Sequence, residues 1–220
     1  MTARRASTAT TSPRPRQPQR KARGDYHHGN LRSALIDAAV VLISEHGVAG
    51  FTLREAARLV GVDHRAAYRH FADRDAVLAA VAEQGYRDLH RLVTEALVDA
   101  GPSIRTRLLT IARVYVRFAF AEPGRYQVLA GPHNYLRFPT TDTAVDDAFA
   151  ILVTEIERGC RRRELVNGDV TELAAWFWST MHGLADLILS RRVRVRRELL
   201  DGFTDRMIGR GLSGVLRKAT

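Results

Sequence analysis

Two histidines, two arginines, a tyrosine and a phenylalanine lie within nine residues, from Asp63 to Phe71, in the stretch GVDHRAAYRHFADRD. Side chains of these types could bind a metal ion, take part in catalysis or contact a charged partner. Metal ligands on a helix are expected at positions i and i+4, whereas His64 and His70 are six residues apart and point in different directions. Catalysis would need a nucleophile or paired carboxylates in suitable register, and the stretch has neither. We therefore expect a contact surface, with no metal ion and no cofactor.

The elements that position this stretch are helices. Apolar residues between positions 31 and 43 recur at steps of three and four, which predicts a helix that Asn30 caps and Gly47 ends. The sequence TLRE (Thr52–Glu55) is a capping box, which predicts a second, short helix to about Val60.

A glycine turn leads into the next helix. Gly61 supplies the turn, Asp63 is suited to cap the helix that follows, and Asp73 is suited to cap a fourth and longer helix. Two short helices joined by a glycine turn, after a longer packing helix, are the layout of a helix-turn-helix unit. Next to DNA an aspartate would oppose binding, so we expect the Asp63 carboxylate to turn back to the helix N–H groups.

The helix after Asp63 has two different sides. At about 100° per residue, Ala67 and Phe71 share the apolar side, whereas Arg65 and Arg69 share the far side. Two arginines at this spacing repel by a few tenths of a kcal/mol in an isolated helix, and a polyanion facing them would reverse that sign. Hydroxyl and imidazole groups on the flanks can reach phosphate oxygens, namely those of His64, Tyr68 and His70.

Most of the net charge of +10 lies in the first 24 residues, which carry seven basic side chains and no acidic one. Their Ser, Thr, Pro and Gln content predicts a disordered segment, either a solubilising tail or an arm that neutralises phosphates. Residues 25–75 hold six basic and seven acidic side chains, so such an arm must supply much of the long-range attraction. Its proposed DNA contacts are Arg14, Arg16, Arg20, Lys21 and Arg23.

Composition limits the cellular setting. A single cysteine, Cys160, excludes a disulfide within the chain and fits a reducing compartment. The longest aliphatic run, Ala38–Ile43, is far shorter than the roughly 20 residues of a membrane helix, and no apolar stretch follows the basic N-terminus. We expect a soluble cytoplasmic protein without a membrane partner.

The later part of the chain also predicts helices, with aromatic residues that could line a ligand pocket or simply form the core. Trp178 and His182 share one helical face, and Asp186 continues it. Ser179, His182 and Asp186 invite a hydrolase interpretation, which we reject because parallel side chains on one helix cannot form the relay. The pocket candidates are Tyr115, Phe118, Tyr126, Trp178 and His182.

The stretch FTLREAARLVGVDHRAAYRHFADRDAVLAAVAEQ, with the preceding LIDAAVVLISEHGVAG, resembles the DNA-binding domain of the TetR family of bacterial transcriptional regulators, over about residues 28–85. The resemblance implies that His64, Arg65 and Ala66 face bases in the major groove. It further implies that Tyr68 and His70 contact the DNA backbone and that Thr52 and Arg74 contact phosphates. Arg54 on the second helix is a further expected contact. We add Arg69 to the expected DNA contacts because it lies on the same side of the helix as Arg65. Arg65 could pair with guanine, worth about 1–3 kcal/mol of discrimination.

The sequence AWFWSTMHGLADLIL, with the upstream FAFAEPGRYQVL, resembles a TetR subfamily whose C-terminal domain carries a Trp and a His-Gly pair. That resemblance implies a helical ligand-binding core and a homodimer. Gly183 lies on a second helical face, with Trp176, Thr180 and Leu187, which we expect to pack tightly or to dimerise.

The sequence thus predicts an all-α protein: a disordered basic arm (1–24), a three-helix helix-turn-helix domain (25–75) and a larger antiparallel helical domain (76–220) for effector binding and dimerisation. The expected function is that of a dimeric, non-enzymatic regulator that binds a palindromic operator and is a repressor released by a small molecule. An architectural DNA-binding protein without effector and a small helical enzyme are the alternatives. The former leaves the large apolar domain unexplained, and the latter the first 75 residues.

Overall fold

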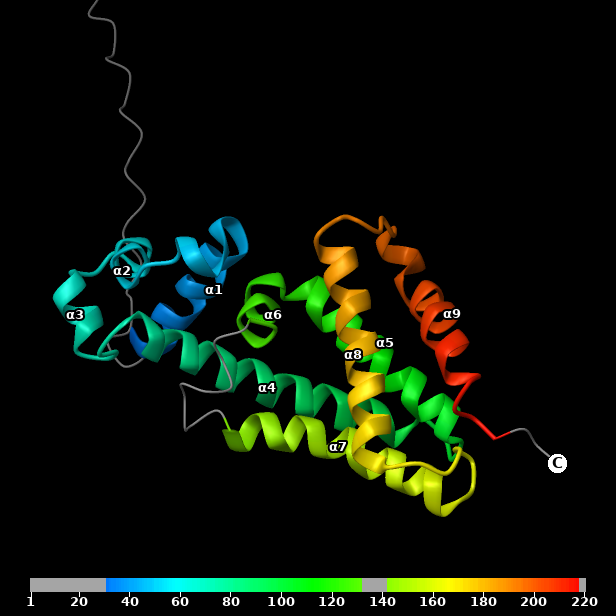
Figure 1. Cartoon of the computed structure of the whole chain (residues 1–220). Coiled ribbons are helices and arrows are strands. Elements are labelled where there is room, and N and C mark those ends of the chain that lie inside the picture. The colour runs from blue at the N-terminus through cyan, green and yellow to red at the C-terminus, as the bar shows by residue number, and fades with distance from the viewer. Residues whose placement is uncertain (1–30, 132–141, 218–220) are drawn as a thin grey trace, which may run out of the picture.

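The chain folds into helices throughout the part that the structure describes. The computed structural model describes residues 31–131 and 142–217, which contain no β-strand and only one isolated bridge, between Leu165 and Leu216 (Figure 1). Asn30 and the basic arm therefore lie outside the described residues. The elements in chain order are α1 (Leu31–Gly50), α2 (Leu53–Val60), α3 (His64–Tyr68), α4 (Arg74–Val98), α5 (Ile104–Ala121), α6 (Pro123–Leu129), α7 (Asp142–Arg161), α8 (Val170–Leu189), the 3₁₀ turn η1 (Arg197–Leu199) and α9 (Leu200–Leu212).

Side-chain caps determine where four of these helices begin. Oγ1 of Thr52 accepts the N–H of Glu55 at 3.2 Å, and its hydroxyl donates to the Glu55 carboxylate at 2.8 Å. Asp63, Asp73 and Asp169 each accept a backbone N–H two or three residues further along the chain, at 2.7–2.9 Å. The predicted starts of α2, α3 and α4 are confirmed, and the DVTE stretch from Asp169 to Glu172, a second capping box, begins α8 in the same way.

The first helix breaks at Gly47, as predicted: φ is 73° and ψ is 169° there, and a short helical segment continues to Gly50. Residues 124–131 predict only one or two short turns, whereas in the structure they largely form the helix α6, which Pro123 begins. Proline suits the first helical position because its N–H would be unsatisfied there in any case.

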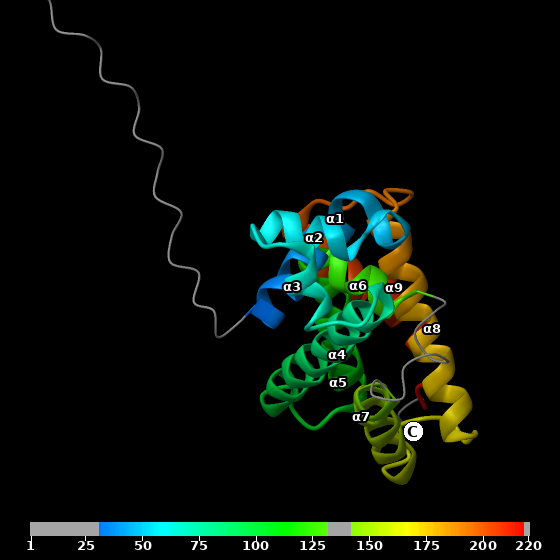
Figure 2. The same ribbon diagram turned by 90° about the vertical axis from the view of Figure 1, so that its left-hand side faces the viewer.

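Helices α1, α2 and α3 pack around a small core with the beginning of α4 (Figures 1 and 2). Phe51, Ala56, Ala67 and Phe71 are at most 3% exposed in this core. By length and a mean hydropathy of 1.3, α1 could cross a membrane, but its residues Leu35, Ile36, Ala39 and Ile43 are buried against neighbouring helices. Helix α1 is therefore a packing helix of this unit.

The second part of the chain is a bundle in which α5 and α7 pack on α4, α8 packs on α5 and α7, and α9 packs on α5 (Figure 1). Helix α6 packs on α1, α4 and α5, and its contact with α1 is close. A Cβ atom at Gly124 would lie 2.3 Å from the carbonyl oxygen of Val40 and 2.4 Å from Oγ of Ser44. The hydrophobic core is continuous from α1 to α9. The domain boundary between residues 75 and 76 stays a prediction, and it falls in the first turn of α4.

Candidate nucleic-acid interface and ligand cavity

Helix α3 is attached to the protein by its apolar side. Ala67 is fully buried and Phe71 is 3% exposed, and the guanidinium carbon of Arg32 lies 5.0 Å from the centroid of the Phe71 ring. Gly61 adopts the left-handed conformation, with a φ of 81°, between α2 and α3. This conformation suits glycine, and it sets the direction in which α3 leaves α2.

The opposite side of α3 is free for contact. Arg65 and Arg69 are exposed, and among the described residues neither guanidinium takes part in an ion pair or hydrogen bond. Tyr68 is 48% exposed, so it packs only in part. His64 and His70 are exposed as well, whereas Ala66 is half-buried. The structure therefore brings two unneutralised cations and three hydrogen-bonding groups to one small surface.

Asp63 turns its carboxylate toward its own helix, as predicted. Oδ1 accepts the N–H of Arg65 at 2.8 Å, and Nδ1 of His64 lies 3.8 Å from the same atom. The negative charge at the N-terminus of α3 is thereby directed at N–H groups.

The residues predicted to contact phosphates at α2 and α4 differ in whether their polar groups already have partners within the protein. Arg54 is exposed and has no ion pair among the residues described. The hydroxyl proton of Thr52 is directed to Glu55, so a phosphate would have to compete for it. Arg74 donates through Nε to the carbonyl oxygen of Phe51 at 3.0 Å and through a terminal nitrogen to that of Val48. Arg74 thus ties α4 to the last turn of α1 and to Phe51, which follows it, a role that the sequence did not suggest.

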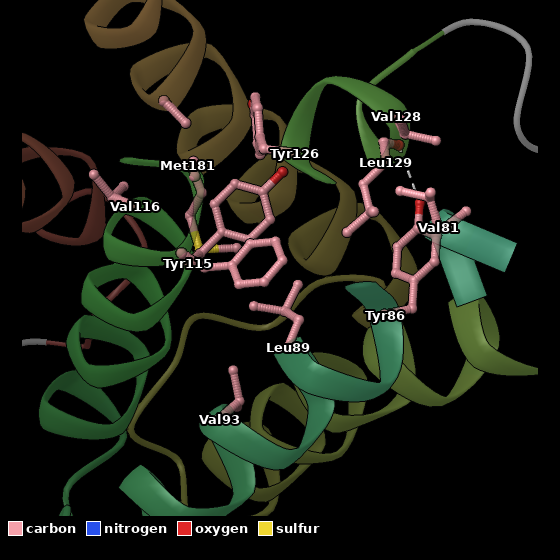
Figure 3. Packing of buried hydrophobic residues seen from close by; sticks show 14 of the residues in the cluster. Val81, Tyr86, Leu89, Val93, Tyr115, Val116, Tyr126, Val128, Leu129 and Met181 are labelled. Carbon is pink, nitrogen blue, oxygen red and sulfur yellow. Dashed lines mark hydrogen bonds between the residues drawn. The ribbon is translucent and has the colours of Figure 1, made fainter. Parts of the chain in front are cut away.

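Four of the five pocket candidates meet in the C-terminal bundle. The hydroxyl of Tyr115 lies 2.7 Å from Nδ1 of His182, and the rings of Tyr126 and Trp178 each lie 5.9 Å from the Tyr115 ring, centroid to centroid. Figure 3 shows Tyr115 and Tyr126 side by side above Leu89. Of the five candidates, only Tyr115 and Trp178 line the adjacent cavity, whereas Tyr126, His182 and the buried Phe118 do not.

That cavity is small and mostly apolar. Its volume is about 20 Å³, room for about one water molecule. The residues that line it come from α4, α5, α7 and α8: Leu89, His90, Val93, Ile111, Tyr115, Ile151, Leu152, Trp178 and Met181.

Tyr126 extends the polar cluster to Asp186. Its hydroxyl donates to Oδ1 of Asp186 at 2.9 Å. Burial raises the pKa of Tyr126 above its ordinary value, and Tyr115 and Asp186 raise it further. The phenol therefore stays protonated and keeps donating this hydrogen bond.

The relay of a serine hydrolase is not formed here. Oγ of Ser179 donates to the carbonyl oxygen of Ala175 at 2.7 Å, while His182 and Asp186 are bonded to Tyr115 and Tyr126. Within the described ranges, no three His, Cys, Asp or Glu side chains are grouped so that they could hold a metal ion.

Helix α6 connects this cluster with the N-terminal helices. Next to Tyr126, Arg125 donates to Oε1 of Gln84 on α4 at 3.1 Å and lies 3.7 Å from Oδ1 of Asp37 on α1. The hydroxyl of Tyr86 donates to the carbonyl oxygen of Leu129 at 3.1 Å (Figure 3). Each of these contacts joins residues more than 40 positions apart, which explains why the sequence did not reveal them.

An ion pair at the far end of the bundle was also missed. Nε and a terminal nitrogen of Arg107 donate to the two carboxylate oxygens of Glu155 at 2.5 and 2.6 Å, and both side chains are at most 11% exposed. The Arg107 guanidinium also donates to the carbonyl oxygens of Leu97 and Gly101. The pair joins α5 to α7 and to the end of α4.

Two family models match the chain. Residues 35–81 match the model for bacterial regulatory proteins of the tetR family, and residues 108–210 match the model for a tetracyclin repressor-like C-terminal domain. The first match contains α2 and α3, and the second contains Tyr115, Tyr126 and the cluster on α8.

Individual proteins are similar too. The HTH-type transcriptional regulator Rv1816 of Mycobacterium tuberculosis is 34% identical over 102 residues, which is 46% of this chain and 44% of the relative, so the chain covers less than half of that protein. The HTH-type transcriptional regulator YobS of Bacillus subtilis is 24% identical over 80% of this chain and 88% of its own length. A solved structure from Rhodococcus sp. RHA1 superposes with a TM-score of 0.76 at 28% identity, over 88% of this chain and all of that chain.

Proposed function

We propose that this chain, which belongs to the TetR family because it carries both the N-terminal and the C-terminal domain of that family, is a dimeric transcriptional regulator. It binds a palindromic operator in double-stranded DNA through its helix-turn-helix unit, without enzymatic activity and in the cytoplasm. It is a repressor that a small-molecule effector releases from the operator.

One observation carries the DNA-binding part of the proposal. Helix α3 is anchored through Ala67 and Phe71 while Arg65 and Arg69 stay exposed and without acidic partners among the described residues. Unneutralised cations on a rigid, convex helix can contact both the base edges and the phosphates of a major groove. The bases are contacted by Arg65, His64 and Ala66, and the phosphates by Arg69, Tyr68, His70, Thr52, Arg54 and Arg74.

The basic arm adds attraction that does not depend on sequence. Its residues lie outside the described ranges, so the proposal rests on charge alone: seven basic side chains and no acidic one in residues 1–24. Such an arm gains affinity by releasing counterions from the DNA, and it is proposed to enter a minor groove.

The dimer is proposed to use the free face of α8. Gly183 was expected to admit a close neighbour, yet nothing in the described chain lies within 4 Å of a Cβ atom built there. Leu187 on α8 and Met207 on α9 are about 40% exposed. A second copy could cover these residues and hold two α3 helices about 34–36 Å apart, as successive major grooves require.

The effector is proposed to enter the cavity beside Tyr115 and Trp178 and to displace the Tyr115–His182 and Tyr126–Asp186 contacts. A cavity of about 20 Å³ holds no effector as it stands, so these side chains must move apart. The Trp and His-Gly signature of the proposed subfamily falls in this cluster, at Trp178 and at His182 and Gly183.

Helix α6 would transmit that movement from α8 to the DNA-binding helices. Tyr126 bonds to α8, and the adjacent Arg125 holds α1 and α4 through Asp37 and Gln84. A displaced Tyr126 would shift α6 against α1, and a change in the spacing of the two α3 helices would follow. To move the protein from mostly bound to mostly free, the effector must prefer one state by several kcal/mol.

Selection of genomic DNA fragments on the purified full-length protein tests the proposal. The expected result is a small set of fragments that share a palindrome, and the flanking genes then suggest effectors to test for release. Fragments without a common sequence would instead support an architectural DNA-binding protein.

A further inference from the structure

A second and larger recess lies between the N-terminal helices and the bundle. It is formed where the chain between α8 and α9 passes the end of α1 and the start of α6, a region in which these segments lie near one another in Figures 1 and 2. Its volume is about 820 Å³, within the usual range for small-molecule sites. We call it the interdomain groove.

The wall of the groove that is formed by the loop after α8 is cationic. Arg191, Arg194 and Arg196 line it, and no carboxylate is among its lining residues. Arg196 lies 3.2 Å from Glu198, whereas within the described chain Arg191 and Arg194 have no ion pair. Two guanidinium groups thus face a recess without compensating charge, which is a donor set for an anion.

The backbone that carries these arginines is held in place. The N–H of Arg191 donates to the carbonyl oxygen of Ile188 at 3.0 Å, and that of Val193 donates to Leu187 at 2.9 Å. Arg191 adopts a left-handed conformation with a φ of 57°, which residues with a Cβ atom rarely adopt. The start of the loop is therefore a defined turn.

The groove also has an apolar lining next to its charges. Val193 and Val195 are half-buried, whereas Arg192, Arg194 and Arg196 are exposed. The valines line the groove together with residues from three helices: Phe120, Pro123, Ile188 and Leu189. The polar, uncharged lining residues are Ser44 on α1 and Gln127 on α6.

We propose that the interdomain groove binds an amphipathic anion: a carboxylate that pairs with Arg191 and Arg194 and carries an aliphatic body that packs on Val193 and Val195. The groove differs from the effector cavity in position, size and charge, so the proposal does not depend on the proposed function. A DNA duplex fits less well, because phosphates on a convex backbone would not use the apolar lining. Since Ser44 and Gln127 belong to α1 and α6, an occupied groove would hold the two parts of the chain together.

Calorimetric titration of the full-length protein with octanoate tests this site. We expect saturable binding of one octanoate per chain and weaker binding of 1-octanol, which has the same body without the charge. The double variant Arg191→Gln/Arg194→Gln should weaken octanoate binding by at least about tenfold, since two charge-assisted hydrogen bonds are lost.

Arg192→Gln is the control in the same loop. It removes one positive charge where the double variant removes two, and Arg192 lines a neighbouring depression beside Tyr126 and Asp186, which shares Gln127 and Leu189 with the groove but not Arg191 or Arg194. Octanoate affinity should change by less than about twofold. An equal loss in both variants would show that only net charge matters, and no binding of octanoate to the wild-type chain would refute the site.

Three other results would also overturn the proposal. Loss of octanoate binding in Tyr115→Phe, but not in the double arginine variant, would place the anion in the effector cavity. A double variant that dissociates the dimer by size-exclusion chromatography would assign these arginines to a subunit interface. A double variant that weakens DNA binding without any octanoate would assign them to DNA.

Discussion

The hydroxyl of Tyr115 on α5 lies 2.7 Å from Nδ1 of His182 on α8, although the two residues are 67 positions apart. The contact joins two helices beside the small cavity, and Trp178 packs edge-on against the same tyrosine. In the proposed function, it is the polar link that an effector entering this cavity would meet first. The proposal therefore gives the cluster two measurable roles, in stability and in the response to an effector.

Replacing Tyr115 with Phe tests the first role. The ring and its packing remain, but His182 loses its partner, so we expect the free energy of unfolding in urea to fall by about 1 kcal/mol. Tyr68→Phe removes a hydroxyl from a half-exposed ring on α3 and should leave this free energy nearly unchanged. Equal effects of the two substitutions would show that the contact does not stabilise the fold.

The ion pair between Arg107 and Glu155 gives a larger expected change. Arg107→Met leaves the Glu155 carboxylate, which is 9% exposed, with only the Arg158 guanidinium at 3.9 Å, and we expect a loss of about 3 kcal/mol of stability. The double variant Arg107→Met/Glu155→Met should recover much of that loss, because no buried charge remains. Arg91→Met is the control: its pair with Glu95 is more than half exposed and should contribute less than about 1 kcal/mol.

The coupling through α6 can be tested at Arg125. Arg125→Met removes the contacts with Gln84 and Asp37 but keeps the apolar part of the side chain. We expect operator affinity without effector to change little, and the loss of affinity on effector addition to become several-fold smaller. Arg87→Met, whose partner Glu83 lies on the same helix, is the control. An unchanged response to effector in Arg125→Met would exclude this route.

The basic arm is tested by the salt dependence of DNA binding. Deleting residues 1–24 should flatten the plot of log affinity against log salt concentration by about 0.9 for each lost phosphate contact. Fluorescence anisotropy with a labelled operator between low and physiological salt measures this slope. A deletion that leaves the slope as it was would make the segment a tail without DNA contacts.

Local signals in the sequence predicted the first four helices and the caps of the second, third and fourth. Thr52, Asp63 and Asp73 cap helices as expected because a cap needs only its own next few residues. The buried side of α3 was predictable for the same reason, since Ala67 and Phe71 are one helical turn apart.

Contacts between distant segments were not predictable in this way. Arg74 was expected to contact phosphate from its place at the start of a helix, yet in the fold its guanidinium reaches the carbonyl oxygens of Val48 and Phe51. Nothing in the sequence signals that these carbonyls lie within its reach. The bond from Tyr126 to Asp186 likewise depends on where α6 packs, and residues 124–131 did not even predict a helix.

Binding of the full-length protein to an operator fragment and to a scrambled duplex of equal length, with and without Arg65→Ala, tests the central claim most directly. We predict that the wild-type chain prefers the operator strongly and that Arg65→Ala lowers that preference by about 1–3 kcal/mol, with little change on the scrambled duplex. Equal binding of both duplexes by the wild-type chain would contradict sequence recognition by α3. An equal loss on both duplexes in Arg65→Ala would make Arg65 a phosphate contact instead of a base contact.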